Sequence, residues 1–357
     1  MNPDFWRGKR VFLTGHTGFK GAWAAFWLKE MGAQVYGYAL APENDPSLYD
    51  LLRMSVPETV SDLNDRPALD AALAEAKPDV ILHLAAQALV RRSYREPVET
   101  FATNVIGTVN LLDAARACEG LKAIVVATSD KAYENVEQVW GYRETDPMGG
   151  RDPYSASKGA CEIAAASMRA SYYQPFTENG HPARIATVRA GNVIGGGDWS
   201  EDRLVPDIVR GCLGPEGGVT LRSPKAIRPW QHVLEPIRGY LAVAERLYSG
   251  DDSAANAFNF GPDRIDEREV VEVADAIVSA LGTGKITIDE AGANLHEAKL
   301  LTLDCSKARA ELGWVPAMRF EDCVRFTADW YGGWHRGRSA EDLCRDQIAE
   351  YTEMYSR

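Results

Sequence analysis

Residues 10–21 read RVFLTGHTGFKG, a short β-branched run followed by a glycine-rich turn. The run Arg10–Thr14 predicts a buried strand, and the segment Ala22–Met31 beyond the turn has the helical period. The turn fits G-x-x-G-x-x-G, whose glycines permit a tight bend and close approach of the backbone to a pyrophosphate. The helix N-terminus adds N–H donors and partial positive charge. The stretch therefore predicts a dinucleotide-binding turn formed by Gly15, His16, Thr17, Gly18, Phe19, Lys20 and Gly21.

The first half of the chain continues as an alternation of strands and helices, which favours this interpretation over a glycine turn without a ligand. The further predicted strands are Gln34–Ala39, Val80–Leu84, Ala123–Thr128 and Arg184–Arg189. Helical stretches fall near Pro67–Ala76, Pro97–Ala117 and Tyr154–Ser171. This order predicts right-handed crossovers and a mostly parallel sheet with helices on both faces. The fold class is therefore α/β, a Rossmann doubly wound parallel sheet with a smaller, mixed C-terminal domain.

The regular alternation ends after Arg189, where glycine and proline break the chain at residues 195–197, 214–215 and 217–218. A helix across Pro236–Leu247 and a strand at Ala257–Phe260 are interpreted as returns to the sheet. We therefore expect a cofactor-binding domain over residues 1–190 with a return segment 229–262. Residues 191–228 and 263–357 are expected to form the substrate-binding domain.

Composition limits the partners of this chain. Its 357 residues are 45% hydrophobic and 25% charged, which is ordinary for a globular protein. The 39 basic and 51 acidic side chains leave a net charge of −12, so general binding to a phosphate backbone is not expected. No apolar run approaches the length that crosses a bilayer. We expect neither a nucleic-acid nor a membrane partner.

The six cysteines are scattered without a C-x-x-C motif or a cluster with histidine. This spacing suits reduced thiols in a reducing compartment and predicts no metal site. We expect the cysteine side chains to be buried and to pack as small hydrophobic groups. The N-terminus also lacks an apolar signal core, so a cytoplasmic location is expected.

Tyr154 and Lys158 are four residues apart and therefore lie on one face of their predicted helix. A phenol has an ordinary pKa near 10, and a neighbouring ammonium stabilises the phenolate, which then acts as a base. Alone, such a pair is common on protein surfaces. Ser129 favours a catalytic role, because it follows the strand Ala123–Thr128 at the edge where doubly wound sheets bind ligands.

The specificity for NAD or NADP is not decided by the glycine motif. Residues 38–40 read YAL at the end of the second strand, where an acidic residue usually holds a ribose. Asp62, Leu63 and Ala85 are expected to line the cofactor. Asp62 has the alternative role of a helix cap.

Several longer stretches of the sequence resemble those of a known protein family. They read TSDK at 128–131, GYRE at 141–144, MGG at 148–150, RAGNVIGGGDW at 189–199, RPWQHVLEP at 228–236, LDCSK at 303–307 and LGW at 312–314. With the glycine turn and the Tyr154/Lys158 pair, they resemble the extended short-chain dehydrogenase/reductase family, and within it the CDP-glucose 4,6-dehydratases. The likeness covers most of the chain, and such strings are far more specific than a single motif.

The resemblance implies a three-step reaction on a nucleotide sugar. NAD would take a hydride from C4 while Tyr154, helped by Lys158 and Ser129, removes the proton of the 4-hydroxyl. Lys131 would then remove the C5 proton, and Asp130 would protonate the departing C6 hydroxyl. Return of the hydride to C6 would give CDP-4-keto-6-deoxyglucose and water. Relatives acting on dTDP-glucose carry glutamate as the C5 base, so Lys131 indicates the CDP type.

Asp130 and Lys131 pose a question of protonation. Their ordinary pKa values near 3.9 and 10.4 favour the ions, whereas acid and base work require the neutral forms. Transfer of one proton within the pair makes both neutral without changing the total charge, and desolvation by the sugar would favour it. The alternative is an ordinary surface ion pair at a strand end.

The resemblance also implies substrate-binding residues and an assembly. Asn192, Arg203, Arg228 and Asn259 lie in strings that the family uses around the sugar nucleotide, and arginine suits a pyrophosphate. Each has an ordinary structural role as its alternative. A homodimer or homotetramer is expected, with Pro97–Ala117 and Tyr154–Ser171 as the candidate contact helices.

Other functions stay open at this point. A nucleotide-sugar 4-epimerase would share Tyr154, Lys158 and the glycine turn but would not need the pair of Asp130 and Lys131. A 4,6-dehydratase for another nucleoside diphosphate hexose is a second alternative. A redox-sensing protein that only binds NAD is a third, and an intact Ser129, Tyr154 and Lys158 set argues against it.

Overall fold

The computed structural model describes residues 1–177, 179–215, 217–221, 223–289 and 298–356. Its centre is a seven-stranded sheet in the order β11-β6-β5-β4-β1-β2-β3, in which every neighbouring pair is parallel. The strands are β1 (Arg10–Thr14), β2 (Gln34–Ala39), β3 (Glu58–Val60), β4 (Val80–His83), β5 (Ala123–Ala127), β6 (Arg184–Ala190) and β11 (Ala257–Phe260). This order confirms the doubly wound Rossmann fold class. The edge strand β3 was not predicted, because it has three residues and no apolar run.

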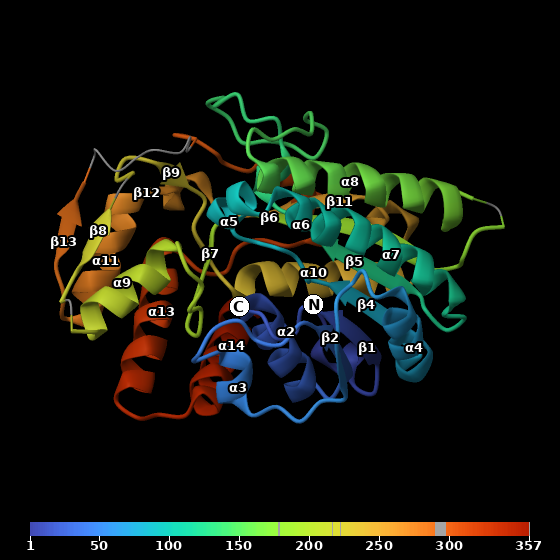
Figure 1. The fold of residues 1–357 in the computed structure, drawn as a ribbon, viewed down its shortest axis with the longest axis horizontal. Coiled ribbons are helices and arrows are strands. Elements are labelled where there is room, and N and C mark those ends of the chain that lie inside the picture. Colours follow the sequence, from blue (N-terminus) through green and yellow to red (C-terminus); the bar gives the residue numbers. More distant parts are fainter. Residues whose placement is uncertain (178, 216, 222, 290–297, 357) are drawn as a thin grey trace.

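Helices cover both faces of the sheet (Figure 1). The helices of this half are α1 (Pro3–Trp6), α2 (Phe19–Glu30), α3 (Leu48–Leu52), α4 (Arg66–Ala76), α5 (Val90–Arg95), α6 (Pro97–Phe101), α7 (Gly107–Ala114), α8 (Pro153–Tyr172) and α10 (Leu234–Tyr248). Successive residues of β1 point to opposite layers: Val11 and Leu13 pack into one core with α2 and α10, and Phe12 packs into the other with α4, α7 and α8. Among the described residues, no helix is both long and apolar enough to cross a membrane.

The helix predicted over Pro97–Ala117 is interrupted. After α6 the chain makes a π-helical turn, η1 (Ala102–Ile106), before α7, and a 3-10 turn, η2 (Ala115–Ala117), ends the stretch. Asn104 in the π turn explains the interruption, because its amide binds the backbone N–H and C=O of Gln87 and the hydroxyl of Ser157. Such turns often occur beside functional sites. Here the turn connects the loop after β4 to α8.

A second, mixed region lies beside the sheet (Figure 1). It contains α9 (Leu204–Leu213), α11 (Val270–Leu281), α12 (Ser306–Leu312), α13 (Phe320–His335) and the short strands β7 (Val193–Ile194), β8 (Val219–Leu221), β9 (Ile227–Arg228), β10 (Gln231–His232), β12 (Arg268–Glu269) and β13 (Ile286–Ile288). These strands form three two-stranded pairs, β10 with β7, β12 with β9 and β13 with β8.

The last helix, α14 (Ala340–Tyr355), packs against both regions. Tyr351 packs edge-on against Trp27 of α2, and Arg345 forms an ion pair with Glu30 at the end of α2. On the other side, the amide of Gln347 donates to the carbonyl of Phe326 in α13. The assignment of residues 263–357 to the substrate-binding domain stays a prediction, since α14 contacts both regions.

All six cysteines are free and buried. Cys344, for example, accepts a hydrogen bond from the indole of Trp330 between α13 and α14. Burial raises the pKa of these thiols, to about 11 at Cys118 and further at Cys305, Cys323 and Cys344. The prediction of reduced thiols that pack as small hydrophobes is confirmed.

Two fully buried histidines predict a loss of stability in acid. Burial lowers the pKa of His83 and His232 from 6.5 to about 3, so the folded state stays neutral where the unfolded chain takes up protons. Stability is therefore complete above pH 6.5 and falls as the pH drops from 6.5 toward 3. Each histidine should cost about 2 kcal/mol at pH 5 relative to pH 8.

Urea unfolding at pH 8 and pH 5 measures this effect. The loss between the two values should be about 2 kcal/mol smaller in His232→Leu than in the native protein. His335→Gln, a change of an exposed histidine, is the control and should keep the native loss. An unchanged pH dependence in His232→Leu would contradict the prediction.

Candidate active site

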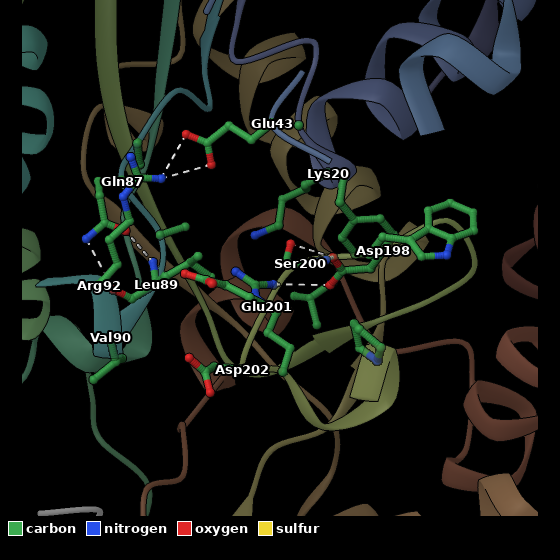
Figure 2. Close-up of a pocket in the computed structure, with 18 of the residues that line it drawn as sticks. Lys20, Glu43, Gln87, Leu89, Val90, Arg92, Asp198, Ser200, Glu201 and Asp202 are labelled. Atoms are coloured by element: carbon green, nitrogen blue, oxygen red, sulfur yellow. Dashed lines mark hydrogen bonds and ion pairs between the residues drawn. The ribbon is translucent and has the colours of Figure 1, made fainter. Parts of the chain in front are cut away.

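A cavity of about 870 Å³ opens at the carboxyl edge of the central sheet, between the two regions. Residues that directly follow β1, β4, β5 and β6 line it, because parallel strands all end at this edge. Figure 2 shows Gln87 and Arg92 of one wall opposite Lys20 and Asp198 of the other. The cavity therefore lies where a doubly wound sheet binds its ligands.

The glycine turn forms the floor of the cavity and fits a dinucleotide. Gly15 has a positive φ of 75°, and a Cβ there would lie 2.6 Å from the backbone N of Ala85. A Cβ at Gly21 would lie 2.0 Å from the carbonyl oxygen of Gly15. Because α2 begins at Phe19, the amides of its first turn have no helical acceptors and are available to a phosphate.

Gly21→Ala is expected to weaken binding of NAD by about tenfold or more, a cost of at least about 1.4 kcal/mol. The added methyl must push Gly15 away from the first turn of α2, which displaces the phosphate-binding amides. Isothermal titration with NAD measures the effect. Gly120→Ala is the control, since its nearest neighbour, Arg10 Nη2, would lie 3.4 Å away. Equal affinities for NAD in the two variants would contradict this prediction.

Six of the seven predicted residues of this turn line the cavity, and His16 does not. The His16 ring lies behind the turn, over Gly37 of β2, and its Nε2 is 2.6 Å from Oε2 of Glu58. Gly37 is required there, because a Cβ would lie 2.6 Å from the ring. The His16 side chain therefore supports the turn from beneath, and the place of His16 in the cofactor-binding turn stays a prediction.

The far end of the cavity is lined by Leu40, Asp62, Leu63 and Ala85. Asp62 is not a helix cap, since the side chain of Asp65 accepts the capping bond of α4. Oδ1 of Asp62 instead accepts hydrogen bonds from the backbone and side chain of Asn64. Asp62 therefore lies on the wall of the cavity, and its contact with the cofactor stays a prediction.

The loop after β2 supplies an acidic residue that sequence reasoning missed. Glu43 lines the cavity, and both of its carboxylate oxygens accept from Nη1 of Arg92 at 2.8 and 2.9 Å (Figure 2). Such an acidic residue usually lies at the end of the second strand, where this chain has Leu40 instead. Only the course of the folded loop brings residue 43 back to the cavity.

Tyr154 and Lys158 enter the cavity from the first two turns of α8. Asp152 caps this helix through the backbone N–H of Ser155, so α8 begins with its N-terminus at the cavity. Burial raises the pKa of Tyr154 to about 12, opposed by its hydrogen bond with Ser129 and by the positive charge of Arg203. Lys158 Nζ donates to the carbonyl of Ala127 at 3.3 Å, and burial lowers its pKa.

Asp130 and Lys131 lie in the short turn η3 (Asp130–Ala132), directly after Ser129. Asp130 is 2% exposed, and its Oδ1 accepts from the Ser129 hydroxyl at 2.9 Å. Its Oδ2 has no hydrogen-bond partner among the described residues. Burial raises the pKa of Asp130, against the positive charge of Lys131. The structure thus places an acid with a raised pKa next in sequence to a lysine, and both residues line the cavity.

Lys20 adds a further cation to this end of the cavity. Its Nζ is 3.5 Å from the hydroxyl of Tyr240, and burial lowers its pKa to about 7, as do the charges of Arg203 and Lys158. Figure 2 shows its side chain pointing into the cavity. The motif placed Lys20 in the turn, but nothing in the sequence indicated where its side chain would point.

Three of the four predicted substrate residues, Asn192, Arg203 and Arg228, line the cavity. Arg228 donates to the carbonyl oxygens of Ile227 and Ala298, and Arg203 lies 3.4 Å from Asp198. These contacts hold both guanidinium groups at the cavity wall.

Asn259 is the exception among the four. It is fully buried in β11, and its side chain is bonded to Tyr133, Tyr142 and Asp304. Because these bonds occupy both ends of its amide and it does not line the cavity, its predicted contact with substrate is corrected to a structural role.

The structure adds ion pairs across the mouth of the cavity that the sequence did not suggest. Arg95 of α5 is 2.9 Å from Glu201, and Arg91 lies 3.6 Å from Asp202. Glu201 and Asp202 belong to the loop that follows the GGGDW string of residues 195–199. The string marked this loop as important, but its partners on α5 lie more than a hundred positions away.

The doubly wound sheet, the glycine cradle and the convergence of Ser129, Tyr154 and Lys158 on one cavity define an extended short-chain dehydrogenase/reductase. The chain belongs to the GDP-mannose 4,6 dehydratase family, whose model matches residues 12–327. The CDP-glucose 4,6-dehydratase of Salmonella typhimurium (strain LT2) is 45% identical to it over 359 residues, which span 100% of each chain. These matches confirm the resemblance inferred from the motifs.

Solved structures agree in fold. The UDP-glucose 4-epimerase of Thermus thermophilus, solved in complex with NAD, is 26% identical, with a TM-score of 0.75 over 91% of this chain and 99% of its own. The epimerase Mth375 of Methanothermobacter thermautotrophicus has a TM-score of 0.78 at 21% identity and covers 96% of each chain. The fold is therefore common to epimerases and dehydratases, and the site has to distinguish them.

Proposed function

We propose that this enzyme converts CDP-glucose to CDP-4-keto-6-deoxyglucose and water with NAD as cofactor. The observation that carries the proposal is the full-length identity of 45% to a CDP-glucose 4,6-dehydratase, together with an Asp130-Lys131 pair on the wall of the cavity. An epimerase needs no such pair. UDP-glucose 4-epimerases match this chain at 26% to 29% identity.

The first step is oxidation at C4 of the glucose. When bound, NAD supplies the acceptor for the hydrogen on C4 and later returns it to C6. Tyr154 removes the proton of the 4-hydroxyl, and Ser129 holds the same oxygen. Lys158, fixed against the carbonyl of Ala127, provides positive charge that stabilises the phenolate form of Tyr154, which accepts this proton. The glycine turn and the wall at Asp62, Leu63 and Ala85 hold the cofactor.

The second step is loss of water across C5 and C6. The new C4 carbonyl acidifies the C5 hydrogen, Lys131 removes it as a proton, and the C6–O bond breaks as Asp130 protonates the leaving hydroxyl. Burial raises the pKa of Asp130 and so shifts it toward the protonated form that this step requires. Lys131 then returns its proton to C5 when C6 is reduced. The enzyme is restored once Tyr154 has released to solvent the proton taken from the 4-hydroxyl and Asp130 has taken one up, which replaces the proton it gave to the leaving water.

Incubation with CDP-glucose deuterated at C4 tests the function. Mass analysis should show loss of water and transfer of the label to the new methyl group at C6. A product of unchanged mass would indicate the epimerase, and absence of reaction would indicate a protein that only binds NAD. Parallel incubations with UDP-, GDP- and dTDP-glucose test the base, and equal turnover of any of these would overturn the choice of CDP.

We also propose that two copies associate through α6, the η1 turn and α8. These neighbouring helices expose the apolar side chains Val98, Phe101, Ile106 and Ile163. Apolar residues grouped on adjacent helices of a surface are typical of contacts between subunits. A second copy is the occupant that fits, since the same face on both subunits forms a closed two-fold pair.

Ile163→Glu is expected to halve the mass measured by light scattering, because it would place two charges in the dimer contact. Ile265→Glu is the matched control, as Ile265 is 66% exposed and Ile163 63%, and Ile265 lies on neither contact helix. The control should keep the native mass. A native protein that is already monomeric would contradict the proposal.

A further inference from the structure

A buried ion pair lies behind the catalytic residues. Glu162 of α8 and Arg189 of β6 are 5% and 4% exposed, and Oε1 of Glu162 is 2.8 Å from Nε of Arg189. A second bond of 2.9 Å joins Oε2 to Nη2, so the pair is bidentate. Neither of these two residues lines the cavity. A role in stability alone does not explain such a pair, because apolar residues of similar size often stabilise a protein core equally well.

The carboxylate of Glu162 also accepts from two threonine hydroxyls. Thr187 of β6 donates to Oε2 at 2.7 Å, and Thr128 at the end of β5 donates to Oε1. Burial alone would raise the pKa of Glu162, but the bonds and the charge of Arg189 outweigh it and hold the pKa below its ordinary value. Glu162 is therefore an anion that four donor groups hold in place.

The pair reaches both ends of the stretch that carries the elimination residues. Thr128 directly precedes Ser129. At the other end, Nη1 of Arg189 donates to the hydroxyl of Tyr133 at 2.7 Å, directly after the turn Asp130–Ala132. That hydroxyl in turn donates to Asn259 at 2.7 Å. Residues 129–132 are thus anchored on each side to the same ion pair.

The pair also belongs to the helix that carries the oxidation residues. Glu162 follows Lys158 by four positions and Tyr154 by eight, so all three lie on one face of α8. A displacement of the Glu162 side chain relative to Thr128 or Tyr133 would therefore shift Asp130 and Lys131 against Tyr154 and Lys158. Displacements of 1 Å at a reacting centre can cost about 100-fold in rate.

From these contacts we infer that Glu162 and Arg189 are positioning residues, which set the register of Ser129–Lys131 against Tyr154 and Lys158 while touching neither substrate nor cofactor. The inference rests on the proposed function, since it assigns the elimination to residues 130 and 131. The ion pair would keep the residues for oxidation at C4 aligned with the residues for elimination, because both sets act on one sugar. Loss of an anchor should slow the elimination more than the oxidation at C4.

Tyr133→Phe tests the inference with little change in volume. It removes the hydroxyl that joins Arg189 to Asn259 and leaves the ion pair intact. We expect kcat to fall by about 10- to 100-fold with KM within about twofold. Reduced nicotinamide should accumulate during turnover, because C4 oxidation then outruns the loss of water. Tyr173→Phe is the matched control, since it removes a buried hydroxyl bonded to the carbonyl of Leu112 in the other core.

A second pair of variants checks the other anchor. Thr128→Val and Thr187→Val each remove one hydroxyl bond to Glu162, but only Thr128 adjoins the catalytic stretch. Thr128→Val should slow C5 proton exchange by about tenfold or more, and Thr187→Val should change it by less than about twofold. The melting temperatures of the two variants should fall alike.

Hydrogen exchange gives a measurement that does not need activity. The amides of residues 129–132 should exchange faster in Tyr133→Phe than in Tyr173→Phe. Equal exchange and equal kinetics in the two tyrosine variants would overturn the inference. Failure of the proposed function would appear elsewhere, as absence of water loss from CDP-glucose in the native enzyme, and the exchange comparison would still decide the positioning role.

Discussion

Lys131→Met should leave oxidation at C4 nearly intact and stop the exchange of the C5 proton with solvent. Methionine keeps the length of the side chain but has no basic nitrogen, so the acidified C5 hydrogen has no acceptor. Overall turnover should fall by about 10²- to 10⁴-fold, the usual contribution of a positioned base. The measurement is deuterium incorporation at C5 in heavy water, followed by mass spectrometry, beside the absorbance of reduced nicotinamide. That absorbance should rise and persist.

Lys225→Met is the control for this change. Lys225 is exposed and carries no role in the site, although its neighbours Ser223 and Ala226 line the cavity. The control should exchange C5 and lose water at the native rate. Native C5 exchange in Lys131→Met would remove Lys131 as the base and leave the elimination without its proposed acceptor.

Tyr154→Phe is expected to lose both steps. Without the phenol the proton of the 4-hydroxyl has no acceptor, so no ketone forms and C5 is never acidified. Turnover should fall by about 10²- to 10⁴-fold, and neither reduced nicotinamide nor C5 exchange should appear. Because burial places the pKa of Tyr154 at about 12 in the free cavity, the phenol is neutral at ordinary pH. Native turnover should therefore rise with pH as the phenolate becomes accessible.

Tyr94→Phe serves as the comparison, since Tyr94 also lines the cavity but is 40% exposed. It should keep native turnover and its pH dependence. The two catalytic variants together separate the steps: one should block the reaction before the ketone and the other directly after it. Accumulation of reduced nicotinamide in Tyr154→Phe would contradict the assignment of the phenol.

Much of the sheet was predictable from local pattern. The strands Arg10–Thr14, Gln34–Ala39 and Ala257–Phe260 have the bounds that were predicted, because buried parallel strands are continuous apolar runs closed by turn residues. The strands of two or three residues in the second region were not predictable. Their pairing depends on partners distant in sequence, as for Ile227–Arg228 with Arg268–Glu269, and so few residues have no period.

Residues of the site were predictable from sequence where their residue type has one common function at that position. Glycines that close a turn, and Ser129 at a strand end, are recognisable because strand ends meet at one edge. The roles of Asp130 and Lys131 were indicated only by the resemblance to the family. Asn259 and His16 were not recognisable, because an amide or an imidazole serves a buried structural bond as well as a ligand contact. Their partners, Tyr133 and Glu58, decide between the two roles.

The order of strands and turns along the chain determined the doubly wound fold, the cofactor turn and the residue types available for oxidation and elimination, since each depends on neighbours within a few positions. Tertiary structure alone decided that Glu162 and Arg189 anchor the catalytic stretch, that Glu43 reaches the cofactor wall and that Lys20 points into the cavity. The physical reason is that these roles depend on burial and on contacts between residues distant in sequence. A side chain acquires its electrostatic environment only when the folded chain has excluded water from around it.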